Sequence, residues 1–430
     1  MFKIDRVVIN GFWGRLTAEC FFDHQMNIII GKNGTGKTTF MNILEAVLSV
    51  DVEGMIKHEF SSVEVYLSDG QKKKTIKANK TEDSKTPFGI MEYKISNHKY
   101  MFKMVSTEDR RFAGSYYRRM QEEANDLKRI MSEIVSVSSI SVYRLRHNDD
   151  YEIRDRNGPR LISPVDYRLN GLIDALTHYQ LTLSQQARGV AANLQKEVLA
   201  SILYSEEDAK DQSYKLDFEK KKEQDNLVSA YQQLNAFDSR TRKKISFHVN
   251  YINETIESLS AELDGNQQKK EKKYAKYRED VDIRSLEALR KSRKIVEMSL
   301  NSERETEEIY SQLNLFIDTL KSFIKDKMFE FKEGVLKVTN SHNSIVHDKL
   351  SSGEKQLLIL LIEALLQKQE PHIFLADEPE LSLHIEWQRK IIPAVIRLNP
   401  NAQVVVATHS PEVASGYPDS IYDMEALIRG

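Results

Sequence analysis

The chain has 430 residues, of which 62 are basic and 64 acidic, so its formal net charge is −2. A chain of this length can bury a sizeable core and is expected to form one large domain or two to three smaller ones. The near-neutral balance excludes a global positive field for nucleic acid or membranes, so any such contact must come from a local patch.

The cysteine content and the hydropathy of the chain indicate the cellular compartment in which the protein is expected. The single cysteine, Cys20, excludes an internal disulfide framework and is typical of a reducing environment. The longest apolar run, 357–362 extended by 364–366, is far shorter than the ~20 residues of a membrane span. The first ten residues lack the basic segment and apolar block of an export signal. We therefore expect a soluble, cytoplasmic protein.

Three short strands are predicted at the start of the chain, over residues 2–9, 16–22 and 26–30. After residue 38 the apolar side chains change to helical spacing, since those at 40, 43, 44, 47 and 48 share one face. The segment 31–38 joins the third strand to this helix. A strand, a glycine-rich loop and a helix follow one another here, as a phosphate-binding loop requires.

The segment 31–38, GKNGTGKT, matches the phosphate-binding pattern G-x-x-x-x-G-K-[ST] in full. Its glycines let successive N–H groups turn toward a phosphate, and the helix N-terminus adds positive potential. We expect Lys37 to reach the β- and γ-phosphates of ATP, Thr38 to bind Mg²⁺, and Thr39 to support the α-phosphate. The candidate nucleotide-binding residues of this segment are Gly31, Asn33, Gly34, Gly36, Lys37, Thr38 and Thr39.

The middle of the chain predicts a β-rich lobe followed by helices. Residues 55–105 alternate and carry turn signals, and 110–134 form a helix whose basic face is more typical of a solvated surface than of a nucleic-acid site. Residues 143–161 are expected to form a hairpin or an exposed loop. From about 170 to 337, glycine and proline almost vanish, which predicts a compact antiparallel bundle or a short coiled-coil arm. A ~40-residue helix spans only ~60 Å, which suits oligomer contacts or partner docking.

Three further motifs follow this helical region. The segment 350–356, LSSGEKQ, precedes a strongly apolar helix and, taken alone, is an ordinary helix start. An apolar strand then delivers Asp377 and Glu378 at its carboxyl end, where open α/β sheets place ligand-binding groups. We expect Asp377 to bind Mg²⁺ directly or through water, and Glu378 to polarise the attacking water as general base. The strand 403–407 leads into His409, which is placed to sense the γ-phosphate.

These motifs together resemble those of a known family. GKNGTGKT, LSSGEKQ, FLADEPE and ATHS resemble the Walker A, signature, Walker B and switch-histidine motifs of ABC-type ATPase heads of the SMC/RecF-like group. The run 377–384, followed by Trp387 and Gln388, further resembles the OLD-like ATPases of bacterial anti-phage systems. Related heads occur in the Septu protein PtuA, including its retron-associated versions, and in the PARIS protein AriA. The resemblance covers roughly residues 1–70 and 340–425.

The resemblance implies an α/β fold: an ABC-type P-loop ATPase head assembled from both chain ends, with an inserted helical bundle or short coiled-coil arm. Residues 1–165 would form the N-terminal part of the head, 166–338 the insertion and 339–430 the C-terminal part. Two heads would dimerise head-to-tail around two ATP molecules. Ser351 and Gly353 of one subunit would then contact the γ-phosphate held by 31–38 of the other, and 380–384 would cross the interface as the D-loop.

The sequence departs from the family in places. Ser352 replaces a glycine, Glu354 a glutamine and Ile385 a proline that are common elsewhere. The glutamine that connects the lobes in this family has no clear counterpart. Its candidates are Gln121, Gln180, Gln185 and Gln186, or a connector at 143–146.

The predicted function is ATP hydrolysis, slow or regulatory, in a bacterial anti-phage defence system. The protein would form a homodimer or a larger oligomer and scaffold or regulate a separately encoded effector, with a phage protein as the expected trigger. Only some twenty residues follow His409, so we expect the nuclease effector to be a separate protein. The alternative is a RecF/SMC-like DNA repair ATPase that acts directly on DNA. A transporter subunit is disfavoured because its motifs would lie much closer together.

Overall fold

The computed structural model describes all residues except 83–87, 107–113, 142–150, 156–157, 202, 204–216, 235, 264–282 and 341–342. The connector predicted at 143–146 lies outside the described residues. Two compact units are present, one formed by 1–180 with 312–430 and the other by 181–311. None of the described helices is long and apolar enough to cross a membrane.

An antiparallel sheet forms one side of the first unit, with described strands in the order β17-β2-β1-β4-β5-β6-β7. Burial alternates along its strands, as in β4, because side chains two positions apart share a face. Val63, Val65 and Leu67 of β4 are fully buried. The strands are β1 (Lys3–Phe12), β2 (Leu16–Phe21), β4 (Ser62–Ser68), β5 (Lys73–Thr81), β6 (Ile90–Ile95), β7 (His98–Lys103) and β17 (Ile428–Arg429).

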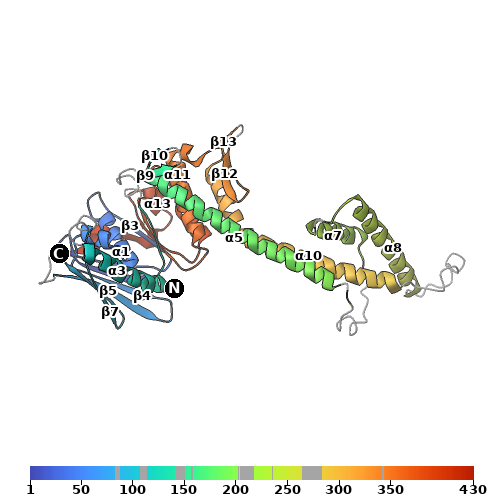
Figure 1. The fold of residues 1–430 in the computed structure, drawn as a ribbon, viewed down its shortest axis with the longest axis horizontal. Coiled ribbons are helices and arrows are strands. Elements are labelled where there is room, and N and C mark those ends of the chain that lie inside the picture. The colour runs from blue at the N-terminus through green and yellow to red at the C-terminus, as the bar shows by residue number, and fades with distance from the viewer. Residues whose placement is uncertain are drawn as a thin grey trace. The chain divides into compact units, whose positions relative to one another are not determined.

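A parallel sheet forms the second layer, in the order β16-β3-β15-β14-β8. Every residue of β14 and β15 is buried, which is typical of parallel strands covered on both faces. Strand β3, from the start of the chain, lies between β15 and β16 from its end, and Figure 1 shows these blue and red segments in one body. The strands are β3 (Met26–Ile30), β8 (Val137–Ser141), β14 (Ile373–Asp377), β15 (Gln403–Ala407) and β16 (Ile421–Asp423).

One core cluster contains residues of both sheets and of the helix α1 (Lys37–Ser49). A buried polar contact also joins the sheets. The Gln403 side chain accepts from the Ile4 N–H at 2.7 Å and donates to the Ile4 carbonyl at 2.7 Å and the Asp23 carbonyl at 2.8 Å. A side chain from near one end of the chain therefore satisfies backbone groups near the other end, as expected if both ends fold together.

Further helices and strands complete the first unit. Of the helix predicted over 110–134, α3 covers 114–134, and 110–113 lie outside the described residues. Of the segment 143–161, the described residues form the hairpin of β9 and β10. These elements are α2 (Val52–Lys57), α3 (Gly114–Ile134), β9 (Tyr151–Asp155), β10 (Gly158–Ile162), β13 (Ser344–Ile345), η2 (His347–Lys349), α11 (Ser352–Leu366), α12 (Ile385–Leu398), α13 (Pro411–Ala414), η3 (Pro418–Ser420) and α14 (Met424–Leu427).

The prediction of helix as far as residue 337 was wrong. Helix α10 (Ile283–Phe323) ends earlier, and β11 (Met328–Lys332) and β12 (Val335–Thr339) follow as a hairpin. Its two-residue loop, Glu333 and Gly334, has φ of 56° and 83°, the left-handed pair that fits a tight hairpin. Phe329, Leu336 and Val338 are buried in alternation along the two strands. This short period-2 pattern is what the helical prediction overlooked.

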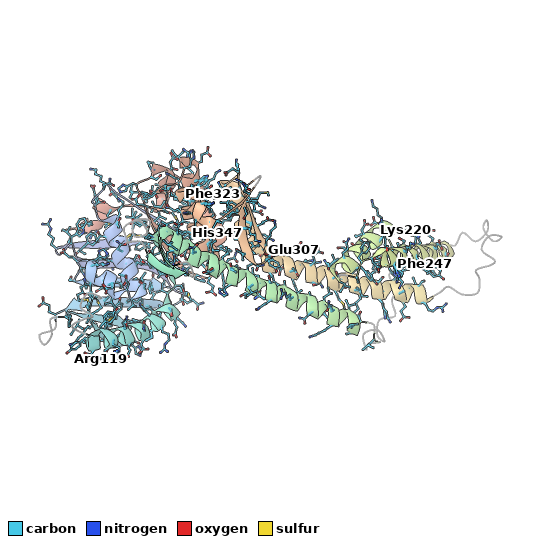
Figure 2. The ribbon with its side chains drawn as sticks, turned by 45° about the horizontal axis from the view of Figure 1, so that its top comes forward. Arg119, Lys220, Phe247, Glu307, Phe323 and His347 are labelled. Atoms are coloured by element: carbon cyan, nitrogen blue, oxygen red, sulfur yellow. The ribbon has the colours of Figure 1, made fainter. Side chains whose placement is uncertain are left out.

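The second unit is helical. It contains α7 (Lys220–Gln233), α8 (Ser239–Leu263) and the adjoining parts of α10 and α5 (Pro164–Ala200). Its cores are small: one cluster is built around Leu227, Ile245 and Val249, another around Ile252 and Ile256. Figure 2 marks Lys220 at the start of α7 and Phe247 on α8. The Phe247 side chain is 71% exposed and stacks on that of Tyr251.

Candidate nucleotide-binding site

The phosphate-binding segment 31–38 connects β3 to α1, the context predicted for it. Gly36 has φ 96°, and a Cβ there would lie 2.9 Å from ring atoms of Phe12 and Trp13. Only glycine fits both this conformation and this close approach. Phe12, at the end of β1, and Trp13, in the turn that follows, therefore pack closely against this segment. Asn33 and Gly34 are exposed at its tip, whereas Thr38 and Thr39 are half-buried.

Lys37 is buried at the centre of the site, with 4% of its surface exposed. Its Nζ donates to the Gly31 carbonyl at 2.9 Å and to the Lys32 carbonyl at 3.2 Å, and lies 2.5 Å from His409 Nε2. Burial lowers the pKa of Lys37, while the nearby carboxylates of Glu378 and Asp377 oppose that effect. Burial and the Lys37 charge lower the pKa of His409. A neutral imidazole can accept a hydrogen bond from the ammonium group.

Thr38 and Asp377 form the candidate Mg²⁺ site. The Thr38 hydroxyl donates to Asp377 Oδ1 at 3.2 Å, and Asp377 is buried at the end of β14. A hydroxyl and one carboxylate, with the other positions left to phosphate and water, are a donor set that suits Mg²⁺. No cluster of three or more His, Cys, Asp or Glu ligands occurs in the described part of the chain. The residues therefore fit an ion that is shared with a nucleotide rather than held by the protein alone.

Glu378 follows Asp377 in a left-handed conformation, with φ 50°. Its backbone N–H donates to the Ala407 carbonyl at 2.8 Å, and its Oε1 lies 3.4 Å from His409 Nε2. Burial and the negative charges of Glu380 and Asp377 raise the pKa of Glu378 to about 8, against the effect of Lys37. A left-handed non-glycine residue with a shifted pKa at a strand end is typical of functional sites.

The segment after β15 brings His409 into contact with the other site residues. Thr408 is fully buried, and the imidazole of His409 contacts both Lys37 and Glu378. The structure therefore brings together five of the predicted site residues, which come from the start of α1 and the carboxyl ends of β14 and β15. They are Lys37, Thr38, Asp377, Glu378 and His409.

The signature segment forms a separate group around the start of α11. Ser351 caps α11, since its hydroxyl accepts from the Glu354 N–H and the Glu354 carboxylate accepts from the Ser351 N–H. A Cβ on Gly353 would lie 2.5 Å from the Ser382 carbonyl oxygen, so only glycine fits there. Gln356 donates to the Pro379 carbonyl at 2.8 Å. These contacts join the signature helix to the loop after β14, and they explain Gly353 without a nucleotide.

Sequence reasoning missed two contacts in this region. Glu380, predicted as the first residue of an interface-crossing loop, is 6% exposed and points into its own subunit, toward Thr408. Gln356 joins the signature helix to the loop after β14, a role that its motif does not indicate. No signal in the sequence pointed to either contact, because Glu380 follows Asp377 and Glu378, and Gln356 follows Glu354 and Lys355.

Comparison with known proteins establishes the family. Residues 2–414 match the family described as AAA ATPase domain. The chain belongs to this family. It is therefore an ATPase, and the prediction of ATP hydrolysis is confirmed.

Curated relatives match over shorter segments. A retron Ec83 probable ATPase of Escherichia coli is 33% identical over 112 residues, which cover 21% of each chain. A Septu protein PtuA of Bacillus thuringiensis is 31% identical over 90 residues, 18% of this chain and 22% of that protein. A retron Vc95 probable ATPase of Vibrio cholerae is 29% identical over 128 residues, 26% of this chain and 25% of that protein. The matches thus span about a fifth to a quarter of these relatives. The predicted resemblance to Septu and retron ATPases is confirmed.

Solved structures with a similar chain path include Smc head domains. One, from Pyrococcus furiosus with an extended coiled coil and bound to the C-terminal domain of ScpA, has a TM-score of 0.41 at 13% identity, covering 96% of this chain and 92% of that one. Another, from Pyrococcus yayanosii with a coiled coil and joint, has a TM-score of 0.40 at 13% identity, covering 96% and 93%.

Proposed function

We propose that this ATPase serves a bacterial anti-phage defence system, in which it dimerises with ATP and regulates a separately encoded effector, expected to be a nuclease. The observation that carries the proposal is the meeting of Lys37, Asp377, Glu378 and His409 at the carboxyl ends of parallel strands. The local similarity to retron and Septu proteins supports the defence role. In this proposal residues 1–165 and 339–430 form the head, and the inserted module, 166–338, is helical as far as the end of α10 and closes with the hairpin of β11 and β12.

Each residue has a proposed role in hydrolysis. Lys37 would leave His409 and bind the β- and γ-phosphates, while the backbone of 31–36 holds the phosphate chain. Thr38 and Asp377 would hold Mg²⁺, which neutralises phosphate charge when bound. Glu378 would accept a hydrogen bond from the attacking water, and His409 would contact the γ-phosphate from the opposite side. Lys37 and His409 are in contact in this structure. A phosphate group that enters between them would move the two side chains apart and bind both.

The proposed dimer places Ser351 and Gly353 against the ATP of the partner. The start of α11 supports this role, because Ser351 is exposed and the helix N-terminus carries positive potential toward an anion. Glu354 is occupied by Lys327, whose Nζ lies 2.6 Å from it, so the first turn is held in place. We therefore propose that this chain binds Mg²⁺, ATP and a second copy of itself. The cytoplasm is its proposed location.

Complementation of two defective variants tests the composite site. Lys37→Ala removes the phosphate lysine, and Ser351→Arg blocks the start of α11; each should be inactive alone. A mixed dimer retains one site with both parts intact, so mixing the two variants should recover ATP turnover. Failure of the mixture to recover turnover, with both variants folded, would disprove the shared site.

Glu378→Gln should keep ATP bound and accumulate as a dimer, which native mass measurement detects.

Copurification tests the defence role. The protein should be purified with the products of its neighbouring genes, with and without ATP, and the mass of the complex measured. An assembly that holds several copies of this chain and an effector supports the proposal. The exposed Phe247 and Tyr251 pair on α8, with Arg240 and Lys243 on the same helix, offers one surface for such a partner.

The alternative, a DNA repair ATPase, predicts tight and salt-sensitive DNA binding by this chain alone. The predicted basic helix, α3, gives it little support. Arg119 pairs with Glu123 at 2.9 Å and Arg129 lies 3.9 Å from Asp126, so the charges of this helix are partly neutralised on its own surface. A solitary chain that dimerises with ATP and binds DNA would favour the alternative over the defence role.

A further inference from the structure

Glu380 is a buried acidic residue whose charge raises the pKa of Glu378, and the roles above give it no contact with ATP. It lies two residues after Glu378, in the turn that follows β14, and only 6% of its surface is exposed. Burial of a carboxylate is costly unless the group is paired or hydrogen-bonded. Its contacts therefore indicate what the group is for.

A single oxygen of Glu380 accepts from three consecutive residues of the segment after β15. Oε1 accepts from the Thr408 hydroxyl, from the His409 backbone N–H at 3.3 Å and from the Ser410 backbone N–H at 3.2 Å. The arrangement resembles the way an acceptor oxygen of a bound ligand is held by successive backbone N–H groups, with the oxygen here supplied by a side chain of the same subunit.

The hydroxyl groups of Thr408 and Ser410 make two further hydrogen bonds that hold the segment 408–410. The Ser410 N–H lies 2.9 Å from the Thr408 hydroxyl oxygen, and the Ser410 hydroxyl donates to Gln388 Oε1 at 2.8 Å. Ser410 in turn caps the short helix α13. Between these fixed neighbours, His409 has its backbone bound to Glu380, while its imidazole remains directed at Lys37 and Glu378.

We propose that Glu380 is a positioning residue for ATP hydrolysis, which fixes the backbone of 408–410 so that the His409 imidazole meets the γ-phosphate beside Lys37 and Glu378. The inference rests on the proposed role of His409. It assigns to Glu380 a function within its own subunit. A carboxylate that served only to stabilise the fold would affect stability but not the step that His409 assists.

The test compares Glu380→Ala and Glu380→Gln with the wild-type protein in kcat, KM for ATP, and affinity for a fluorescent ATP analogue. Glu380→Ala should lower kcat about 10- to 100-fold, the range for misplacing one catalytic group, with nucleotide affinity changed less than about threefold. Glu380→Gln retains a carbonyl oxygen that can accept the same hydrogen bonds, so it should recover much of the loss. Glu386→Gln, at an exposed position in the first turn of α12, is the matched control and should behave as wild type.

A double-mutant cycle separates positioning from stability. Once His409→Ala has removed the imidazole, Glu380→Ala should lower kcat little further, because both changes act on one group. If the two losses multiply, or if Glu380→Ala leaves kcat unchanged while His409→Ala lowers it, the positioning role is overturned and the proposed site stands. If His409→Ala leaves kcat unchanged, the role of His409 and the role of Glu380 both fail. Should Glu380→Ala not fold, Glu380→Gln and Thr408→Val enter the same cycle.

Discussion

The two sheets of the first unit differ in how far their strands are exposed to solvent. In the antiparallel sheet one face is buried and the other carries exposed ion pairs, such as Lys77 with Glu64 and Lys99 with Glu92. In the parallel sheet β14 and β15 are buried throughout, and polar groups occur only where these strands end. Charges on the first are screened by water, whereas charges at the ends of the second act on one another.

The difference shows where this fold places side chains with shifted pKa values. At the carboxyl ends of the parallel strands, burial and neighbouring charge shift the pKa of Lys37, of Glu378 and of His409. On the exposed face of the antiparallel sheet, Arg6 pairs with Glu19 and Lys77 with Glu64, and both pairs are open to solvent. Substitutions in the two sheets should therefore differ in kind, and the following experiments test this.

The largest effect is expected for Lys37→Ala. This change removes the ammonium group, whose charged hydrogen bonds to phosphate contribute about 3 kcal/mol, so ATP affinity should fall about 100-fold. Titration with a fluorescent ATP analogue measures it. Lys32→Ala, in the same segment but with an exposed side chain, should bind ATP as the wild type does. Unchanged affinity in Lys37→Ala would remove this segment from the nucleotide site.

Gln403→Leu should break the link between the sheets. The substitution leaves the Ile4 N–H, the Ile4 carbonyl and the Asp23 carbonyl without the side-chain partner that they now have, which should lower the free energy of unfolding by about 3 kcal/mol. Denaturant unfolding measures the change. Gln25→Leu, an exposed position just before β3, should change it by less than about 0.5 kcal/mol. Equal stability of the two variants would mean that the sheets do not depend on this contact.

Acid should destabilise the protein through His372, at the start of β14. Burial lowers the pKa of His372 to about 4, below the ~6.5 of an unfolded histidine. As the pH falls from 6.5 to 4, the unfolded chain takes up a proton that the folded state resists, so stability is lost over that window. His372→Gln should therefore lose about 3 kcal/mol less than wild type between pH 7 and pH 4. His98→Gln, exposed at the end of the antiparallel sheet, is the control and should match wild type.

The smallest effect is expected on the exposed face. Lys77→Met removes a lysine that is 41% exposed and pairs with Glu64, and exposed pairs of this kind contribute about 0.5 kcal/mol or less. Unfolding free energy should barely change, and ATP turnover should equal that of wild type. A large loss of turnover would show that this face takes part in the reaction, and would end the distinction between the sheets.

Much of the fold followed from the sequence where a pattern was long or a motif strict. The segment 31–38, with a buried strand before it and an amphipathic helix after it, predicted the start of the site, and the strand ends at Asp377 and Ala407 predicted its other side. The structure brings these segments together. The roles assigned to the individual residues stay predictions that the variants above can test.

What the sequence could not show depended on partners far along the chain. Strands β16 and β17 are three and two residues long, and they are strands only because β3 and β2 lie beside them. The hairpin after α10 is too short to outweigh the helical pattern before it. Glu380 belongs to a turn, and neither its burial nor its contact with Thr408 can be derived from spacing.

The position of β3 in its sheet affects how the protein can be made. Both of its neighbours, β15 and β16, come from the last thirty residues of the chain, and Gln403 lies 399 positions after its partner Ile4. At about 5–20 residues per second, a ribosome needs roughly 20–80 s to reach them. During that time the apolar strand before the phosphate-binding segment has no sheet to join, which favours aggregation or chaperone binding. A nascent chain should therefore gain nucleotide affinity abruptly, only as its final strands emerge.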